Sequence, residues 1–305
     1  MNAKLTFVHA LSPLHAGTGQ GVGVIDLPIA REKATGIPYL PGSSLKGTLR
    51  DLCPNETDEE KAKKKAVFGP DPKIDLASDH AGSAQFSDQR LLLLPIRSLK
   101  GTFAWVTSPY LLQRLTRDAV SGNGSLPCPA QPPTLTGKQF GVAKTGCALL
   151  YQKRKSDGKG TIPTVILEDL DLDDQSAFDA IAWAEWIGVR AFGDKDWLKP
   201  RLCIVPDDVL TFLLNTATEI TARIRLDEKL KTVARGALWY EEALPTETLL
   251  SGLLVATEVK ATRAVVFEVV EGVLSKHNTV QLGGKATVGR GVCAVNTWPK
   301  TQGGK

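Results

Sequence analysis

The sequence has few cysteines, and no two of them are spaced to bind zinc. Its five cysteines, Cys53, Cys128, Cys147, Cys203 and Cys293, are far apart along the chain. The CxxC pairs of a zinc ribbon are therefore missing. An odd number of isolated thiols is typical of a protein kept in a reducing compartment rather than of a disulfide framework. We expect a cytoplasmic protein with free thiols.

Long hydrophobic runs are missing as well. The longest apolar stretches, such as residues 91–94 and 253–256, are far shorter than the roughly 20 residues needed to cross a bilayer. The apolar start at residues 5–11 is interrupted by His9 and is too short for the core of a secretory signal. We therefore expect no membrane partner.

The chain also lacks a strong excess of either charge. Its 37 Lys and Arg residues against 33 Asp and Glu residues give a net charge of +4. This balance permits nucleic-acid binding without indicating it. The strongest local basic bias lies in residues 138–159. At 305 residues and 42% hydrophobic, the chain can form one large domain or two ordinary ones.

Helix and strand patterns are mixed along the chain without a strict alternation. Period-two or β-branched segments predict strands at residues 4–11, 83–97, 103–106, 220–226, 249–259 and 264–270, and at the end of the chain. Helical patterns occupy residues 45–52 (capped by Ser43 or Ser44), 56–67, 110–120, 173–189 (capped by Asp173 or Asp174) and 206–214. This mixture predicts an α+β fold with an antiparallel sheet.

A glycine-rich loop near the end of the chain is the first candidate for phosphate contact. Residues 283–291 include Gly283 and Gly284, with Lys285 and Arg290 supplying positive charge. Closely spaced glycines let a backbone approach a phosphate. The loop lacks the order of a Walker motif, and a simple turn before an edge strand is the alternative.

The helix expected at residues 45–52 is the second candidate. Lys46 and Arg50 are four residues apart and share one helix face. Ser43 and Ser44 lie at its start, where exposed backbone amides favour an anion. Together these residues predict a site for the backbone of a nucleic acid.

A polar, glycine-rich loop between His15 and Asp26 is the candidate for chemistry. An aspartate beside a ribose phosphate could hold a divalent metal ion or assist attack by a 2′-hydroxyl, and a histidine could act as acid or base. The alternative is that Asp26 caps a turn and His15 is a hydrogen-bonded loop residue. Spacing alone does not decide between them.

Several segments together resemble the RAMP proteins, and most closely the backbone subunits of type III-B (Cmr) CRISPR effector complexes. The resemblance covers nearly the whole chain, in residues 15–19, 23–32, 36–47, 86–98, 101–109, 236–245 and 283–291. The glycine-rich loop is shared by many RAMP proteins, whereas the segments around Asp26 and at residues 238–242 are more specific to this subunit.

The resemblance implies a modified ferredoxin-like or RRM-like palm with insertions that form fingers and a thumb. It implies a single domain over residues 1–305, with the palm built from the N- and C-terminal parts and insertions at roughly 53–85 and 120–260. Copies of such subunits stack into a helical filament on the guide crRNA, together with other Cmr subunits. Target RNA paired to the guide is cut at regular intervals by a metal-dependent reaction.

The resemblance also implies roles for individual residues. Asp26 matches the family's catalytic aspartate, which makes it the expected ligand of a divalent metal (Mg or Mn) at the cleavage site. His15 matches a loop position near that site, and Lys46 a position in the RNA-contacting helix. Glu241 lies in a segment like a conserved acidic element, with the adjacent Glu242 as the alternative match. Ala243 stands there in place of an expected tyrosine.

Three other functions compete with a target-cutting subunit. A non-catalytic RNA-binding scaffold of the same filament would use Asp26 only as a turn residue. A stand-alone RAMP that processes guide precursors would be expected to have a His-centred acid–base site. An unrelated metabolic enzyme has no cofactor fingerprint to support it.

Overall fold

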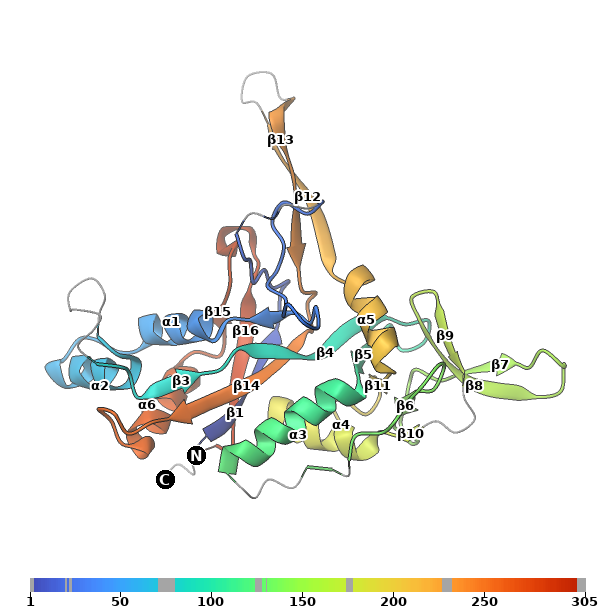
Figure 1. The fold of residues 1–305 in the computed structure, drawn as a ribbon, viewed down its shortest axis with the longest axis horizontal. Coiled ribbons are helices and arrows are strands. Elements are labelled where there is room, and N and C mark those ends of the chain that lie inside the picture. The colour runs from blue at the N-terminus through green and yellow to red at the C-terminus, as the bar shows by residue number, and fades with distance from the viewer. Residues whose placement is uncertain are drawn as a thin grey trace.

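The computed structural model describes residues 3–19, 21, 24–70, 80–123, 128–129, 131–173, 178–226 and 232–300. One large mixed sheet forms its centre (Figure 1), in the order β10-β6-β11-β5-β4-β14-β1-β16-β15. These strands are β1 Ala3–Ala10, β4 Gln89–Arg97, β5 Phe103–Thr107, β6 Gly141–Val142, β10 Phe178–Asp179, β11 Leu202–Ile204, β14 Leu249–Ala256, β15 Val280–Gln281 and β16 Val292–Trp298. Two short strands join it from the side, with β2 (Tyr39–Leu40) on β4 and β3 (Ala84–Phe86) on β14.

The central part of this sheet is antiparallel, as expected. β1 lies between β14 and β16 and is antiparallel to both, and β14 is antiparallel to β4. Two pairs at the far edge are parallel, namely β5 with β11 and β6 with β10. The fold is therefore α+β with a mixed sheet rather than a purely antiparallel one.

Helices cover both faces of the sheet, because β1 is apolar on both sides. Val8 and Ala10 belong to the core shared with α1 (Gly42–Leu52), α2 (Asp58–Phe68) and α6 (Arg263–Lys276). Leu5 and Phe7 belong to the core shared with α3 (Pro109–Asn123) and α4 (Ile181–Ile187). Successive side chains of a strand point to opposite faces, so a strand buried on both sides is almost continuously apolar.

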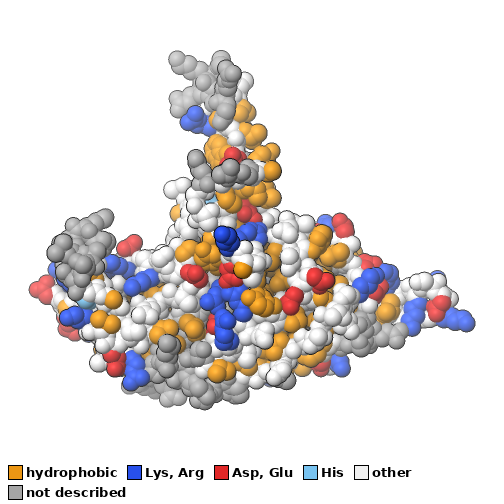
Figure 2. Space-filling view, in the orientation of Figure 1, with side chains coloured by type: hydrophobic (Ala, Val, Ile, Leu, Met, Phe, Trp, Pro, Cys, Tyr) orange, Lys and Arg blue, Asp and Glu red, His pale blue; other side chains and the backbone are white. Residues whose placement is uncertain are grey.

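Two smaller sheets project from the body (Figure 1). A hairpin of β12 (Glu219–Leu226) and β13 (Val233–Ala243) follows α5 (Asp207–Thr216) and stands away from the main sheet. A three-stranded sheet of β7 (Tyr151–Arg154), β8 (Thr161–Leu167) and β9 (Leu170–Asp173) extends from the far end. Figure 2 shows hydrophobic side chains gathered along the first hairpin.

Three local predictions were wrong. Residues 264–270 belong to helix α6 and not to a strand, since the buried Val266, Val270 and Val273 follow the helical period. The helix expected from residue 173 begins only at Ile181, because residues 170–173 form β9 of a hairpin instead. No serine caps α1: it begins at Gly42, whose N–H donates to the Asp88 carboxylate at 3.0 Å.

β14, which lies within the segment 120–260 expected as an insertion, pairs with β1 at the sheet centre. The five cysteines are free thiols. In the parts of the chain that the structure describes, no helix is both long and apolar enough to cross a membrane. The remaining short elements are a π-helical turn at Gly188–Phe192 and a 3-10 turn at Ala286–Val288.

Candidate nucleic-acid site

The segment 14–17 joins the parts of the sequence that carry the candidate site residues. Leu14 pairs with Leu244 at the end of β13. The His15 carbonyl accepts a hydrogen bond from the Gly284 N–H at 2.9 Å, and the Ala16 carbonyl accepts one from Ala30 at 2.7 Å. One short segment therefore connects the glycine-rich loop, the hairpin and the residues that follow Asp26.

Asp26 lies on the surface at the base of the projecting hairpin. Leu27 forms a parallel bridge with Glu241 of β13, which places Asp26 beside the backbone of Tyr240. The Tyr240 N–H donates to Asp26 Oδ2 at 2.7 Å. One carboxylate oxygen is thus anchored to the backbone, while the residue itself is exposed to solvent. This arrangement fixes the orientation of the carboxylate and leaves it open to a ligand.

His15 is close to Asp26 along this network but is buried. Its side chain contacts the Glu242 carbonyl oxygen through Nδ1 at 2.6 Å. Its ring packs under Gly17, since a Cβ at that position would come within 2.5 Å of Nε2. The ring therefore holds two segments together, a role closer to support than to direct proton transfer.

Glu241 is buried and fully engaged in ionic contacts. Its carboxylate accepts a hydrogen bond from Trp239 Nε1 at 2.8 Å and pairs with Lys285 at 2.9 Å and Arg223 at 3.3 Å. Burial alone would raise the pKa of Glu241, but the Trp239 hydrogen bond and the two cations outweigh it and lower the pKa to about 2. Glu241 thus joins the hairpin to the glycine-rich loop as a group that is ionised at neutral pH.

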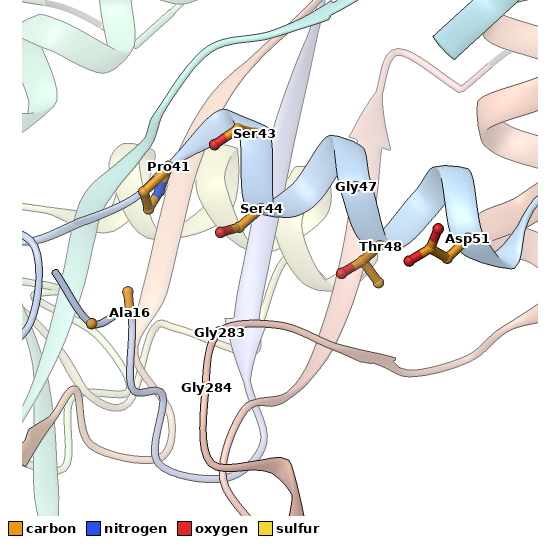
Figure 3. Close-up of a pocket in the computed structure, with 10 residues that line it drawn as sticks. Ala16, Pro41, Ser43, Ser44, Gly47, Thr48, Asp51, Gly283 and Gly284 are labelled. Atoms are coloured by element: carbon orange, nitrogen blue, oxygen red, sulfur yellow. The ribbon is translucent and has the colours of Figure 1, made fainter. Parts of the chain in front are cut away.

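A groove of about 380 Å³ lies between the start of α1 and the glycine-rich loop (Figure 3). Ser43, Ser44 and Thr48 lie along the α1 side, opposite Gly283 and Gly284. Gly283 has a φ of +72°, and a Cβ there would come within 2.5 Å of the His15 carbonyl oxygen. Only glycine therefore allows this close approach of the two loops. The other lining residues are Ala16, Gly17, Pro41, Gly47 and Asp51.

The four predicted RNA-contacting cations do not line this groove. Lys46 is half-buried, and its pKa is lowered by burial and by the neighbouring Arg50. Arg50 donates to the Pro70 carbonyl at 2.8 Å. Lys285 pairs with Glu241, and the largely buried Arg290 donates to the Thr221 hydroxyl at 3.0 Å. The groove itself offers hydroxyl groups, a glycine backbone and, at its far end, the Asp51 carboxylate.

Comparison with known proteins identifies the family of this chain. Residues 7–294 match the sequence model of the RAMP superfamily. The chain belongs to the RAMP superfamily. It is 36% identical over 314 residues to the CRISPR system Cmr endoribonuclease Cmr4 of Pyrococcus furiosus, with 100% of this chain and 98% of the relative covered.

Solved RAMP structures have the same fold. The crystal structure of oligomeric Cmr4 from Pyrococcus furiosus superposes with a TM-score of 0.71 at 30% identity, covering 97% of this chain and 98% of that one. A chain of the type III-B Cmr-beta complex bound to cognate target RNA also gives a TM-score of 0.71, with 97% of each chain covered. At 20% identity, this second likeness concerns the fold alone.

Sequence analysis of this RAMP chain missed three contributors. Thr48 lines the groove one helical turn after Ser44, a spacing visible in the sequence. Asp88 supplies the cap of α1 from a distant turn, which no local pattern could reveal. Arg31 pairs with Glu242 at 2.6 Å, a contact between segments more than 200 residues apart.

Proposed function

We propose that this chain is the guide-RNA-binding backbone subunit of a type III-B CRISPR effector complex and that it cuts the target RNA paired to the guide. The observation that carries the proposal is Asp26, an exposed carboxylate anchored through one oxygen to the Tyr240 N–H at the base of a projecting hairpin. The full-length relative at 36% identity is itself named an endoribonuclease.

The groove between α1 and the glycine-rich loop is the proposed site for the guide backbone. Serine and threonine hydroxyls and glycine N–H groups are common donors to phosphate oxygens, and such contacts carry no sequence preference. Ser43, Ser44, Gly283 and Gly284 line this groove, whereas Lys46, Arg50, Lys285 and Arg290 act from its surroundings. Pairing with the guide then supplies the specificity.

We propose cleavage by attack of a 2′-hydroxyl on the adjacent phosphate. The new bond joins the 2′-oxygen to phosphorus as the 2′-hydroxyl gives up its proton, and the bond to the 5′-oxygen breaks as that oxygen takes up a proton. The products are a 2′,3′-cyclic phosphate and a 5′-hydroxyl. A nucleotide displaced by the hairpin would bring these atoms into line, and such alignment accounts for much of the rate. Asp26 is the catalytic residue, while the buried His15 and Glu241 support it.

A divalent metal, Mg or Mn, is the proposed cofactor. No cluster of three His, Cys, Asp or Glu side chains capable of holding a metal occurs within the described ranges. Magnesium is commonly held by one or two carboxylates with substrate phosphates and water, so Asp26 fits as its single protein ligand. When bound, the metal would neutralise charge on the phosphate.

The order β4-β14-β1-β16, with α1 and α6 on one face, supports our proposal of a ferredoxin-like palm in a single domain. The hairpin β12–β13 is the proposed thumb. Ile220, Ile224 and Leu238 are at least half exposed on one side of it, which suits contact with nucleobases or with the next copy in a filament. Guide RNA, target RNA, further copies and other Cmr subunits are the proposed partners.

The Asp26→Asn variant tests this function. The complex is reconstituted with guide RNA, and end-labelled complementary RNA is incubated with magnesium or manganese. We expect a regular ladder from the native chain and a rate lower by on the order of 100-fold or more for Asp26→Asn, with target binding unchanged. Asp157→Asn, at the distant tip of the β7–β8 hairpin, is the control. Equal cutting by both variants would identify the chain as a scaffold.

A further inference from the structure

Glu242, the neighbour of Glu241, is the centre of a separate set of contacts that fixes the segment after Asp26. Its backbone N–H donates to the Leu27 carbonyl at 3.0 Å. Its side chain accepts from the Ile29 N–H at 3.1 Å and from Arg31 at 2.6 Å. Backbone and side chain of one residue thus hold three positions within five residues of Asp26.

Arg31 extends this set of contacts to the element that precedes the hairpin. Its guanidinium donates to the Gly36 carbonyl at 3.0 Å and to the Leu214 carbonyl of α5 at 3.1 Å, in addition to Glu242. A planar guanidinium with several donors suits such a role because its geometry is rigid. The Asp26 segment is therefore fastened to both β13 and α5.

Burial makes the Glu242–Arg31 pair sensitive to substitution. The Glu242 side chain is only 4% exposed and that of Arg31 is 26% exposed. Removing one partner of a buried pair leaves an uncompensated charge, which is strongly unfavourable. The Glu242 carbonyl also contacts His15 Nδ1 at 2.6 Å. A shift of Glu242 would therefore also move His15, whose carbonyl is bonded to the glycine-rich loop.

The two adjacent glutamates act on different neighbours, because consecutive side chains of a strand point to opposite faces. Glu241 is directed to Lys285 and Arg223, and it joins the hairpin to the glycine-rich loop. Glu242 is directed to Ile29 and Arg31. Of the two glutamate side chains, it is that of Glu242 which contacts the segment that follows Asp26.

We propose that Glu242 and Arg31 together position Asp26 for cleavage. This inference rests on the proposed function, since it assigns positioning residues to the same reaction. The Asp26 carboxylate is held by the Tyr240 N–H, two residues before Glu242, so the geometry of the site depends on the register between residues 26–31 and β13. The Glu242–Arg31 pair maintains that register.

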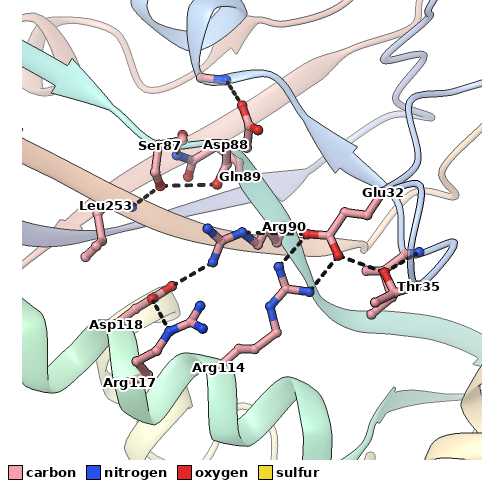
Figure 4. A network of polar contacts seen from close by, with 12 residues as sticks. Glu32, Thr35, Ser87, Asp88, Gln89, Arg90, Arg114, Arg117, Asp118 and Leu253 are labelled. Carbon is pink, nitrogen blue, oxygen red and sulfur yellow. Dashed lines mark hydrogen bonds and ion pairs between the residues drawn. The ribbon is translucent and has the colours of Figure 1, made fainter.

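The next ion pair along the same segment provides a matched control. Glu32 accepts hydrogen bonds from both terminal nitrogens of Arg114 on α3 and lies 3.8 Å from Arg90 (Figure 4). Substituting Glu32 by Gln removes one negative charge, as Glu242→Gln does, from the residue next to Arg31, but the partners of Glu32 lie on α3 and β4 rather than on the hairpin. It should not change the register at Asp26.

The experiment measures position and cutting separately. In Glu242→Gln, Arg31→Gln and the double variant, hydrogen exchange in the free protein reports on the Ile29 and Tyr240 amides. Single-turnover cutting and target affinity are measured in the assembled complex. We expect faster exchange at both amides, a cutting rate roughly 10-fold lower at unchanged affinity, and a double variant no slower than the slower single one. Glu32→Gln should match the native chain.

Unchanged exchange at these amides in Glu242→Gln would overturn the inference, as would normal cutting despite faster exchange. An equal loss in Glu32→Gln would also overturn it, because the effect would then be general. The Asp26→Asn variant tests the proposed function separately. Normal cutting by that variant would overturn the proposed function, while hydrogen exchange would still show whether Glu242 and Arg31 hold the segment after Asp26.

Discussion

At the scale of single residues, the acidic groups of the site have distinct surroundings. Asp26 is exposed and has one oxygen on a backbone N–H. Glu241 is buried between two cations and an indole N–H. Glu241 therefore cannot easily take up a proton near neutral pH, because its surroundings strongly favour the ionised form. Sequence analysis identified both Asp26 and Glu241 as candidate catalytic residues but could not separate their roles.

The lowered pKa of Glu241 predicts a pH-dependent contribution to stability. A carboxyl group with a pKa of about 2 when folded, against an ordinary 4.5, stabilises the fold above pH 4.5 and loses that contribution as the pH falls towards 2. Because the Glu241 side chain is only 4% exposed and two cations would lose their partner, we expect Glu241→Gln to lower the free energy of unfolding by about 3 kcal/mol at pH 7. Urea unfolding of both proteins should show this gap narrowing below pH 4.5; a constant gap would contradict it.

At the scale of elements, sequence patterns identified most helices and strands but failed where tertiary contacts decide. β1, α2 and β16 follow their local patterns closely, and α2 begins with a Thr57–Glu60 capping box. The valine-rich α6 favoured a strand by composition, yet its buried face packs on the sheet as a helix. Propensity is a weak constraint when a packing surface is available.

The start of α1 gives a prediction about an element. Because Asp88 and not Ser43 caps the helix, Asp88→Ala should lower the free energy of unfolding by about 1 kcal/mol, and Asp88→Asn should restore most of it. Ser43→Ala should leave stability unchanged and weaken guide RNA binding, since Ser43 lines the groove. Chemical unfolding and RNA titration check the two effects. Equal destabilisation by Ser43→Ala would contradict this assignment.

At the scale of the whole molecule, the candidate site is assembled from distant parts of the chain. The glycine-rich loop, the Asp26 segment and the hairpin meet through residues 14–17. Sequence analysis identified these segments as separate candidates, and the structure brings them into contact through residues 14–17. It could not predict the pairing of Arg31 with Glu242 or the position of the hairpin, because both depend on contacts across most of the chain.

The apolar side of the hairpin gives a prediction about assembly. Ile224 and Leu238 are opposite each other on β12 and β13 and are 51% and 54% exposed. Replacing both with threonine keeps the strand propensity and should change the free energy of unfolding by less than about 0.5 kcal/mol. Assembly on guide RNA, measured by analytical ultracentrifugation, should weaken. Leu99→Thr, at an equally exposed site outside the hairpin, is the control and should assemble normally.

The pairing of β1 with β16 has a consequence for how the protein is made. During synthesis the first strand of the central sheet leaves the ribosome long before its neighbour, since Val8 pairs with Val295. The apolar strand β1 therefore stays without this neighbour until β16 has been translated. Such distant pairings slow folding and leave partly folded states open to aggregation. The centre of the sheet can form only once β16 has left the ribosome, which makes the newly made chain a candidate client of molecular chaperones.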